Sequence, residues 1–152
     1  MTEQGLLNTT AEYGYPIDVI TEAVPFAGMP VYQTATAGTF ALATNAVKPL
    51  GFTIVTSVPN PELCLGTTAV AGQPNSIMPI RDGVIVKMPV TATGVITCGK
   101  PISIGAVAGY VTQRTTENYI IGIAMESVNN ATGASGDKFV KVCCAPYYIY
   151  TA

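Results

Sequence analysis

The stretch 94–101 comes closest to a motif that performs chemistry. It reads Gly-Val-Ile-Thr-Cys-Gly-Lys-Pro, and the spacing of its two glycines and its lysine matches the start of a phosphate-binding loop. The next residue of that motif is a serine or threonine whose hydroxyl holds magnesium, and here it is Pro101. The residues that follow favour a strand, so no helix N-terminus is expected to face a phosphate. The sequence therefore argues against nucleotide binding.

Groups for acid–base, nucleophilic or metal chemistry are scarce. The chain has no histidine, and its nine carboxylates are scattered. Glu126 lies in an apolar run, where burial raises a carboxyl pKa, although such a residue more often faces solvent. The four cysteines, Cys64, Cys98, Cys143 and Cys144, lack paired zinc-ligand spacing. We expect no enzyme, no cofactor and no metal.

The chain start carries no positive segment followed by an apolar block, as a secretory signal would. This predicts synthesis in the cytoplasm and cysteines that remain free thiols, with disulfides as the alternative.

The composition is unusually poor in charge. Charged residues make up 11% of the chain, against about 25% in ordinary domains. Much of the folded surface must therefore be uncharged, which predicts that part of it is covered by a partner protein. The net charge of −2 gives no basic face for nucleic acid. The longest apolar run, 101–111, is too short to cross a bilayer, so no membrane partner is expected.

The apolar pattern predicts an all-β protein. Short runs rich in β-branched residues recur about every 8–12 residues, with Gly, Pro, Asn and Asp turns between them. This spacing favours a small β-sandwich or barrel-like domain over alternating βαβ units. A length of 152 residues predicts one domain.

An ungapped internal repeat connects the two halves of the chain. Glycines and prolines that recur at one spacing indicate a shared backbone path, which predicts two tandem related β units. Identical residues 71 positions apart include Val24/Val95, Gly28/Gly99, Pro30/Pro101, Ala35/Ala106, Ala37/Ala108, Gly38/Gly109, Thr44/Thr115 and Gly51/Gly122. The structural turns expected from this pattern are Gly28, Pro30, Gly38, Gly51, Gly99, Pro101, Gly109 and Gly122.

The expected organisation is an extended N-terminal arm (1–19) and a single β domain (20–152). Within the domain we expect a first β unit (20–58), a linker loop (59–81), a second β unit (82–144) and a tail (145–152). The arm has apolar residues that need cover, either on their own domain or on a neighbour, and the tail is rich in tyrosine. The candidate protein-contact residues are Leu6, Leu7, Tyr13, Tyr15, Tyr147, Tyr148 and Tyr150.

Residues 82–142 resemble the small capsid decoration, or cement, proteins of tailed bacteriophages. The runs that carry this resemblance are 94–97, 99–105, 108–112, 120–128 and 134–142, which match a glycine-opened strand, an Ile-Gly-Ile-Ala strand and a closing Gly-Asp strand. The resemblance implies a protein that binds the major capsid protein on the outside of an assembled capsid, often as a homotrimer, and bridges capsomers.

The resemblance also implies that the protein is made in the host cytoplasm and resides in the virion. The N-terminal half matches only through its glycines and prolines, so a capsid contact by that half is not implied. Two alternatives remain open: another virion part, such as a head fibre base, tail or baseplate module, or a carbohydrate-binding β-sandwich. The chain has no tryptophan, which argues against the sugar-binding alternative.

Overall fold

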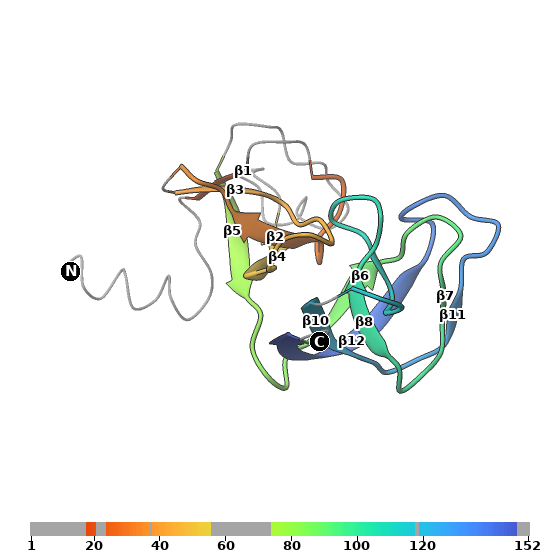
Figure 1. The fold of residues 1–152 in the computed structure, drawn as a ribbon. Coiled ribbons are helices and arrows are strands. Elements are labelled where there is room, and N and C mark those ends of the chain that lie inside the picture. The colour runs from red at the N-terminus through yellow and green to blue at the C-terminus, as the bar shows by residue number, and fades with distance from the viewer. Residues whose placement is uncertain (1–17, 21–23, 37, 56–73, 118, 149–152) are drawn as a thin grey trace.

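The computed structural model describes residues 18–20, 24–36, 38–55, 74–117 and 119–148. Every regular element in these ranges is a β-strand, which confirms the all-β class. Strands β1 to β5 form one unit and strands β6 to β12 form a second unit beside it (Figure 1).

The first unit is a small closed barrel. Its strands pair in the order β1-β3-β2-β4-β5, and β5 pairs back onto β1. Only β1 and β3 run parallel, and the other pairs in this ring are antiparallel. The strands are β1 (Asp18–Ile20), β2 (Pro30–Gln33), β3 (Thr39–Leu42), β4 (Gly51–Val55) and β5 (Pro74–Pro79).

The second unit has a five-stranded sheet in the order β6-β12-β10-β8-β9. A parallel bridge between Val90 and Val111 links the residue after β6 to β9, so this sheet nearly closes on itself. Its strands are β6 (Ile85–Pro89), β8 (Pro101–Ile104), β9 (Val111–Gln113), β10 (Tyr119–Ala124) and β12 (Phe139–Tyr148). Strands β7 (Val95–Ile96) and β11 (Val128–Asn129) form a separate two-stranded sheet.

The two units share strand order and register, so they are two tandem related β units. Strands β1, β2, β3, β4 and β5 occupy the ring positions of β6, β8, β9, β10 and β12. Val31 pairs with Leu42 in the first unit, and 71 positions later Ile102 pairs with Gln113. The other β2 pairings repeat likewise: Tyr32–Ala41 as Ser103–Thr112, Gln33–Phe40 as Ile104–Val111, Val31–Gly51 as Ile102–Gly122, and Pro30–Phe52 as Pro101–Ile123.

Hydrogen bonds outside the strands repeat at the same offset. The N–H of Ala43 donates to the carbonyl of Pro30 at 2.9 Å, and the N–H of Arg114 donates to that of Pro101 at 2.8 Å. A shared offset in loop hydrogen bonds as well as in strand register indicates one backbone design used twice.

Four of the expected turn glycines have positive φ, which favours glycine. These are Gly28 at 81°, Gly38 at 72°, Gly99 at 81° and Gly109 at 79°. The repeat therefore predicted these backbone conformations.

The other four expected turn residues lie within strands, which corrects that prediction. Pro30 and Pro101 open β2 and β8, where the first residue of a strand can lack an N–H donor. Gly51 opens β4 and Gly122 lies within β10. A Cβ at Gly51 would lie 2.7 Å from the carbonyl oxygen of Met78, and one at Gly122 would lie 2.2 Å from that of Cys143. These glycines allow close approach of the neighbouring strand.

Three expected boundaries are also corrected. Strand β1 begins at residue 18, inside the expected arm. Strand β5 lies inside the expected linker loop. A strand can form there because its two prolines stand at its ends, and Ile77 is buried in the core. Strand β12 extends into the expected tail, because Tyr147 and Tyr148 pair with Ile120 and Tyr119 beyond a register shift in β10.

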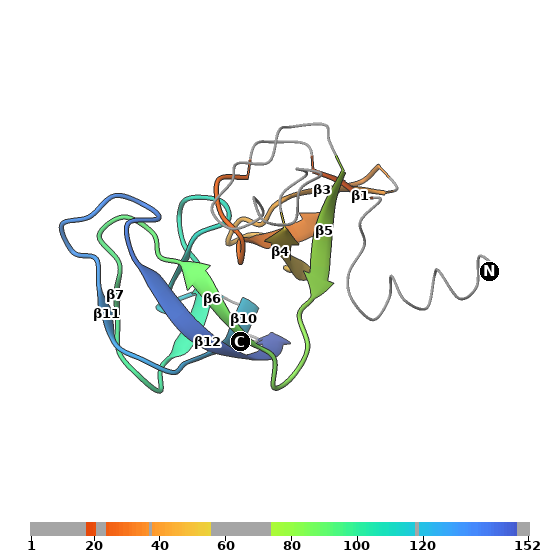
Figure 2. The same cartoon turned by 180° about the vertical axis from the view of Figure 1, so that it is seen from behind.

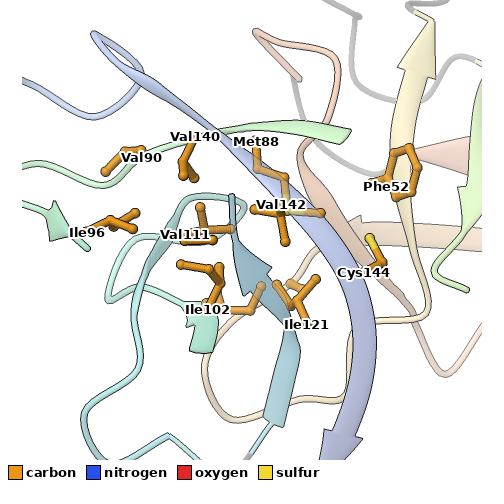
Figure 3. Close-up of a cluster of buried hydrophobic side chains, with 13 residues drawn as sticks. Phe52, Met88, Val90, Ile96, Ile102, Val111, Ile121, Val140, Val142 and Cys144 are labelled. Carbon is orange, nitrogen blue, oxygen red and sulfur yellow. The ribbon is translucent and has the colours of Figure 1, made fainter. Parts of the chain in front are cut away.

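Each unit contributes to the core of the other. The larger core cluster lies within the second sheet and also contains Ala43 and Phe52 from the first unit. Figure 3 shows Phe52 on β4 beside Cys144 of β12. The smaller cluster lies in the first unit, and Ala108 and Tyr110 of the second unit pack against it. The two units therefore have separate sheets but share packed apolar side chains.

Candidate protein-contact surfaces

The junction between the units is built from two turns that are not equivalent in the repeat. In the first unit, a Cβ at Gly28 would lie 2.0 Å from the carbonyl oxygen of Lys87. In the second unit, a Cβ at Gly109 would lie 2.7 Å from Cε of Met29. Their repeat equivalents, Gly99 and Gly38, have nothing within 4 Å. The units therefore dock through different surfaces, as in a head-to-tail contact.

The side chains at the junction follow the same asymmetry. Met29 and Leu42 are buried where the first unit meets Gly109. Their equivalents 71 positions later are Lys100, which is exposed, and Gln113, which is half-buried. The apolar residues therefore occur in the copy of the surface that is covered, and polar residues occur in the copy that meets solvent.

One face of the second sheet carries a row of apolar side chains that are exposed or half-buried. Ile85, Cys143, Ile123 and Pro101 are cross-strand neighbours on β6, β12, β10 and β8. Ile85 is 56% exposed and the other three are half-buried. On β12, Cys143 lies between Val142 and Cys144, whose side chains point to the opposite side of the sheet and are buried in the core.

The adjoining row on this face carries positive charge. Lys87 and Lys141 are directly opposite each other, and both are exposed. Met125, 44% exposed, follows β10, and its N–H donates to the carbonyl of Lys141 at 2.8 Å. We call the following set the outer face: Ile85, Lys87, Pro101, Ile123, Met125, Lys141 and Cys143.

Three further large apolar side chains are exposed away from the outer face. Leu50 is 45% exposed and precedes β4, Val107 is 46% exposed in the turn between β8 and β9, and Val95 is 52% exposed in β7. Strands β7 and β11 lie at the end of the molecule away from the first unit (Figure 1). Exposed apolar side chains thus occur at one position of the first unit, Leu50, and at several positions of the second unit, as expected for contact surfaces.

The stretch 94–101, which resembles the start of a phosphate-binding loop, folds as the short strand β7, a turn and the first residue of β8. The N–H groups of Gly99 and Lys100 donate to the carbonyls of Ala124 and Thr97, at 2.8 and 3.2 Å. Strand β8 begins at Pro101, so a strand follows the lysine. These two N–H groups are already used within the fold and do not point at a phosphate.

Two carboxylates of the described ranges have structural roles. Glu126 is half-buried, and its carboxylate accepts the N–H of Lys141 at 2.9 Å. Burial acts to raise the pKa of Glu117, but hydrogen bonds from backbone N–H groups, including those of Thr115 and Thr116, outweigh it and lower that pKa. Both carboxylates thus hold turns and strand ends in place.

The cysteines differ in their surroundings. Cys98 is exposed, Cys143 half-buried and Cys144 buried, and all three are free thiols. Burial, and secondarily the neighbouring Cys143, raises the pKa of Cys144 to about 11. A thiol that stays protonated at neutral pH is a poor nucleophile. Cys64 lies outside the described residues.

The predicted contact residues are only partly described. Leu6, Leu7, Tyr13, Tyr15 and Tyr150 lie outside the described residues. The backbones of Tyr147 and Tyr148 form the end of β12.

The sequence did not lead to the outer face, although one signal for it was present. In the run 139–143, the buried Val140 and Val142 alternate with Lys141 and Cys143.

No family model matches the chain, and no curated protein is similar to it. Within the described ranges, no helix is long and apolar enough to span a membrane.

Proposed function

We propose that this protein is a virion structural protein that decorates and stabilises the outer surface of an assembled viral capsid by bridging capsomers. The observation that carries the proposal is the distribution of large apolar side chains that are at least 44% exposed over separate elements of both units. A protein that bridges capsomers must contact more than one neighbour. These side chains are Leu50, Ile85, Val95, Val107 and Met125.

The shared core supports the same proposal. A bridge transmits load only if its contact surfaces are fixed relative to each other, and interdigitated side chains give that rigidity. Phe26 makes edge-to-face contacts with Phe139 and Tyr110 of the second unit, with ring centroids 5.3 and 6.4 Å apart. Such ring pairs hold the two units in one orientation.

The resemblance to phage decoration proteins supports the proposal at the level of particular strands. The Ile-Gly-Ile-Ala run is β10, and the glycine-opened strand is β8 with Gly99 before it. In a cement protein each single contact can be weak, because one molecule engages several sites on the shell and many copies act together.

The test uses heads of its virus that lack this protein. Purified protein is added, binding is measured by co-sedimentation, and the temperature of head rupture is measured by DNA release. We expect saturable binding and a higher rupture temperature. A protein that neither binds heads nor raises that temperature would contradict the proposal.

Matched variants sharpen this test. Val95→Asp with Val107→Asp places two charges on exposed apolar positions and is expected to weaken head binding at least about tenfold. Asn45→Asp with Thr132→Asp adds the same charge at exposed polar positions and is expected to bind normally. Electron micrographs of labelled particles then separate a head surface location from a tail or baseplate location.

A further inference from the structure

The lysines of the outer face form an unfavourable pair. Lys87 and Lys141 are directly opposite on β6 and β12, which lie side by side (Figure 2). Like charges in this position destabilise a sheet. Within the part of the chain that the structure describes, neither ammonium group has an ion-pair partner. Carboxylates from a bound segment would remove this repulsion.

The surroundings of the lysines add a second requirement. Ile85 is 56% exposed and Met125 is 44% exposed on either side of the pair. Ile123 and Cys143, both half-buried, continue the apolar row between them. A segment that fits this face must therefore combine carboxylates with large apolar side chains and carry no positive charge.

The N-terminal segment 1–17 of the chain itself has this composition. It contains Glu3 and Glu12 and neither lysine nor arginine. Its large apolar side chains include Leu6, Leu7, Tyr13 and Tyr15. An extended chain of 17 residues spans up to about 60 Å, which is enough to reach a neighbouring molecule.

Charge is unevenly distributed along the chain, with more acidic residues in its N-terminal part and more basic residues in its C-terminal part. Before residue 80 the chain holds five of its nine carboxylates and only one of its seven cations, Lys48. The remaining cations are Arg81, directly before the second unit, and five residues within that unit. A head-to-tail contact between copies would therefore bring the acidic part of one to the basic part of the next.

We propose that the outer face of one copy binds the N-terminal segment of a second copy, and that this contact builds the homo-oligomer. Strand β1, from which the segment departs, lies on the side of the first unit away from β6 and β12 (Figure 1). Binding to a neighbour avoids the return path that binding to its own outer face requires. The inference rests on the oligomer of the proposed function and leaves Leu50, Val95 and Val107 for the capsid.

The experiment measures self-association of the full chain by sedimentation velocity from about 1 to 100 µM. We expect the wild type to form an oligomer that weakens when salt rises from about 50 to 500 mM. Lys87→Glu with Lys141→Glu impairs the face, and Glu3→Lys with Glu12→Lys impairs the segment. Each double variant alone is expected to self-associate at least about tenfold more weakly.

Mixing the two variants distinguishes this contact from a general charge effect. The first variant keeps an intact segment and the second an intact face, and the reversed face of the first is complementary in charge to the reversed segment of the second. The mixture is therefore expected to recover the association that each variant alone has lost. Lys48→Glu with Lys100→Glu changes the net charge equally at exposed positions and is expected to associate as the wild type does. Circular dichroism checks that each variant folds. If Lys87→Glu with Lys141→Glu does not fold, Lys87→Gln with Lys141→Gln removes the two charges without reversing them.

A monomeric wild type, a face variant that associates normally, or a mixture that associates no better than each variant alone would overturn the inference. Head binding is measured on the same variants. Monomers that still bind and stabilise heads refute this contact and leave the proposed function intact, whereas oligomers that ignore heads refute the proposed function alone.

Discussion

The backbone N–H of Gly109 donates a hydrogen bond to the carbonyl oxygen of Ala43 at 2.9 Å, across the junction between the two β units. The same glycine has a positive φ of 79° and no room for a Cβ. Its repeat equivalent, Gly38, has a φ of 72° and open space around it. Gly38 is therefore favoured by its backbone conformation alone, whereas Gly109 is favoured by its backbone conformation and also by the close approach of Met29 and Leu42.

Gly109→Ala is expected to cost more stability than Gly38→Ala. Both changes force alanine into a left-handed conformation, at about 1 kcal/mol each. Only at Gly109 would the new Cβ also lie 2.7 Å from Met29 and 3.0 Å from Leu42. Overpacking of this kind adds about 1–2 kcal/mol. Urea unfolding measures the difference, and equal losses in the two variants would show that the junction relaxes freely.

Gly28→Ala and Gly99→Ala form a second matched pair, with φ values of 81° at both positions. At Gly28 the Cβ would lie 2.0 Å from the backbone carbonyl of Lys87, which cannot rotate away as a side chain can. We expect a loss of about 3 kcal/mol or more for Gly28→Ala and about 1 kcal/mol for Gly99→Ala. Thermal unfolding checks this ranking, and the reverse order would refute the close approach of the units.

Phe26→Leu is expected to loosen the junction. The change keeps an apolar side chain but removes the ring contacts with Tyr110 and Phe139, which are worth about 0.5–1.5 kcal/mol each. We expect a loss of about 1–3 kcal/mol in the free energy of unfolding. The control is Phe40→Leu, a half-buried ring against the same cluster with no ring pair among the described residues. A Phe40 variant as unstable as the Phe26 variant would count against the ring contacts.

Stability is expected to fall with rising pH above the ordinary pKa of a thiol. Burial raises the pKa of Cys144 from 9.0 to about 11, so the folded state holds this proton more tightly than the unfolded state does. The stabilisation is therefore complete below pH 9.0 and is lost as pH rises toward about 11. Cys144→Val removes this group, and its unfolding free energy should decline less steeply over that range. Identical slopes for the two proteins would disprove the assignment.

The repeat was predictable because glycine and proline constrain the backbone directly. Gly28 and Gly99 share their φ, and the β2 pairings recur at the same offset of 71 residues. The docking of the two units was not predicted. Identical residues in the repeat show the backbone path that both copies have in common, but the junction is built from positions at which the copies differ. The informative positions were the substitutions, such as Met29 against Lys100.

Strand β5 and the end of β12 were missed because local turn chemistry was given too much weight. Pro74 and Pro79 indicated a loop, yet both stand at strand ends. The expected tail likewise began at residue 145, but the pairing of β12 with β10 continues to Tyr148 beyond a register shift between Ile120 and Gly122. Long-range pairing decides such cases, and a single sequence does not display it.

The outer face was missed for a related reason. Lys87 and Lys141 are 54 positions apart in sequence and become neighbours only through the β6–β12 register. Neither lysine stands out in its own segment. The pair is visible only once the strands are aligned.

In both units the first strand pairs with the last. Strand β1 joins β5, and β6 joins β12, so Val19 pairs with Pro74 and Pro89 with Phe139. A growing chain therefore cannot close the first ring until the segment through β5 has left the ribosome, and the second ring waits for β12. Contacts of such long sequence separation slow folding. A chain truncated before β12 would expose the unpaired edge of β6 and be prone to aggregate.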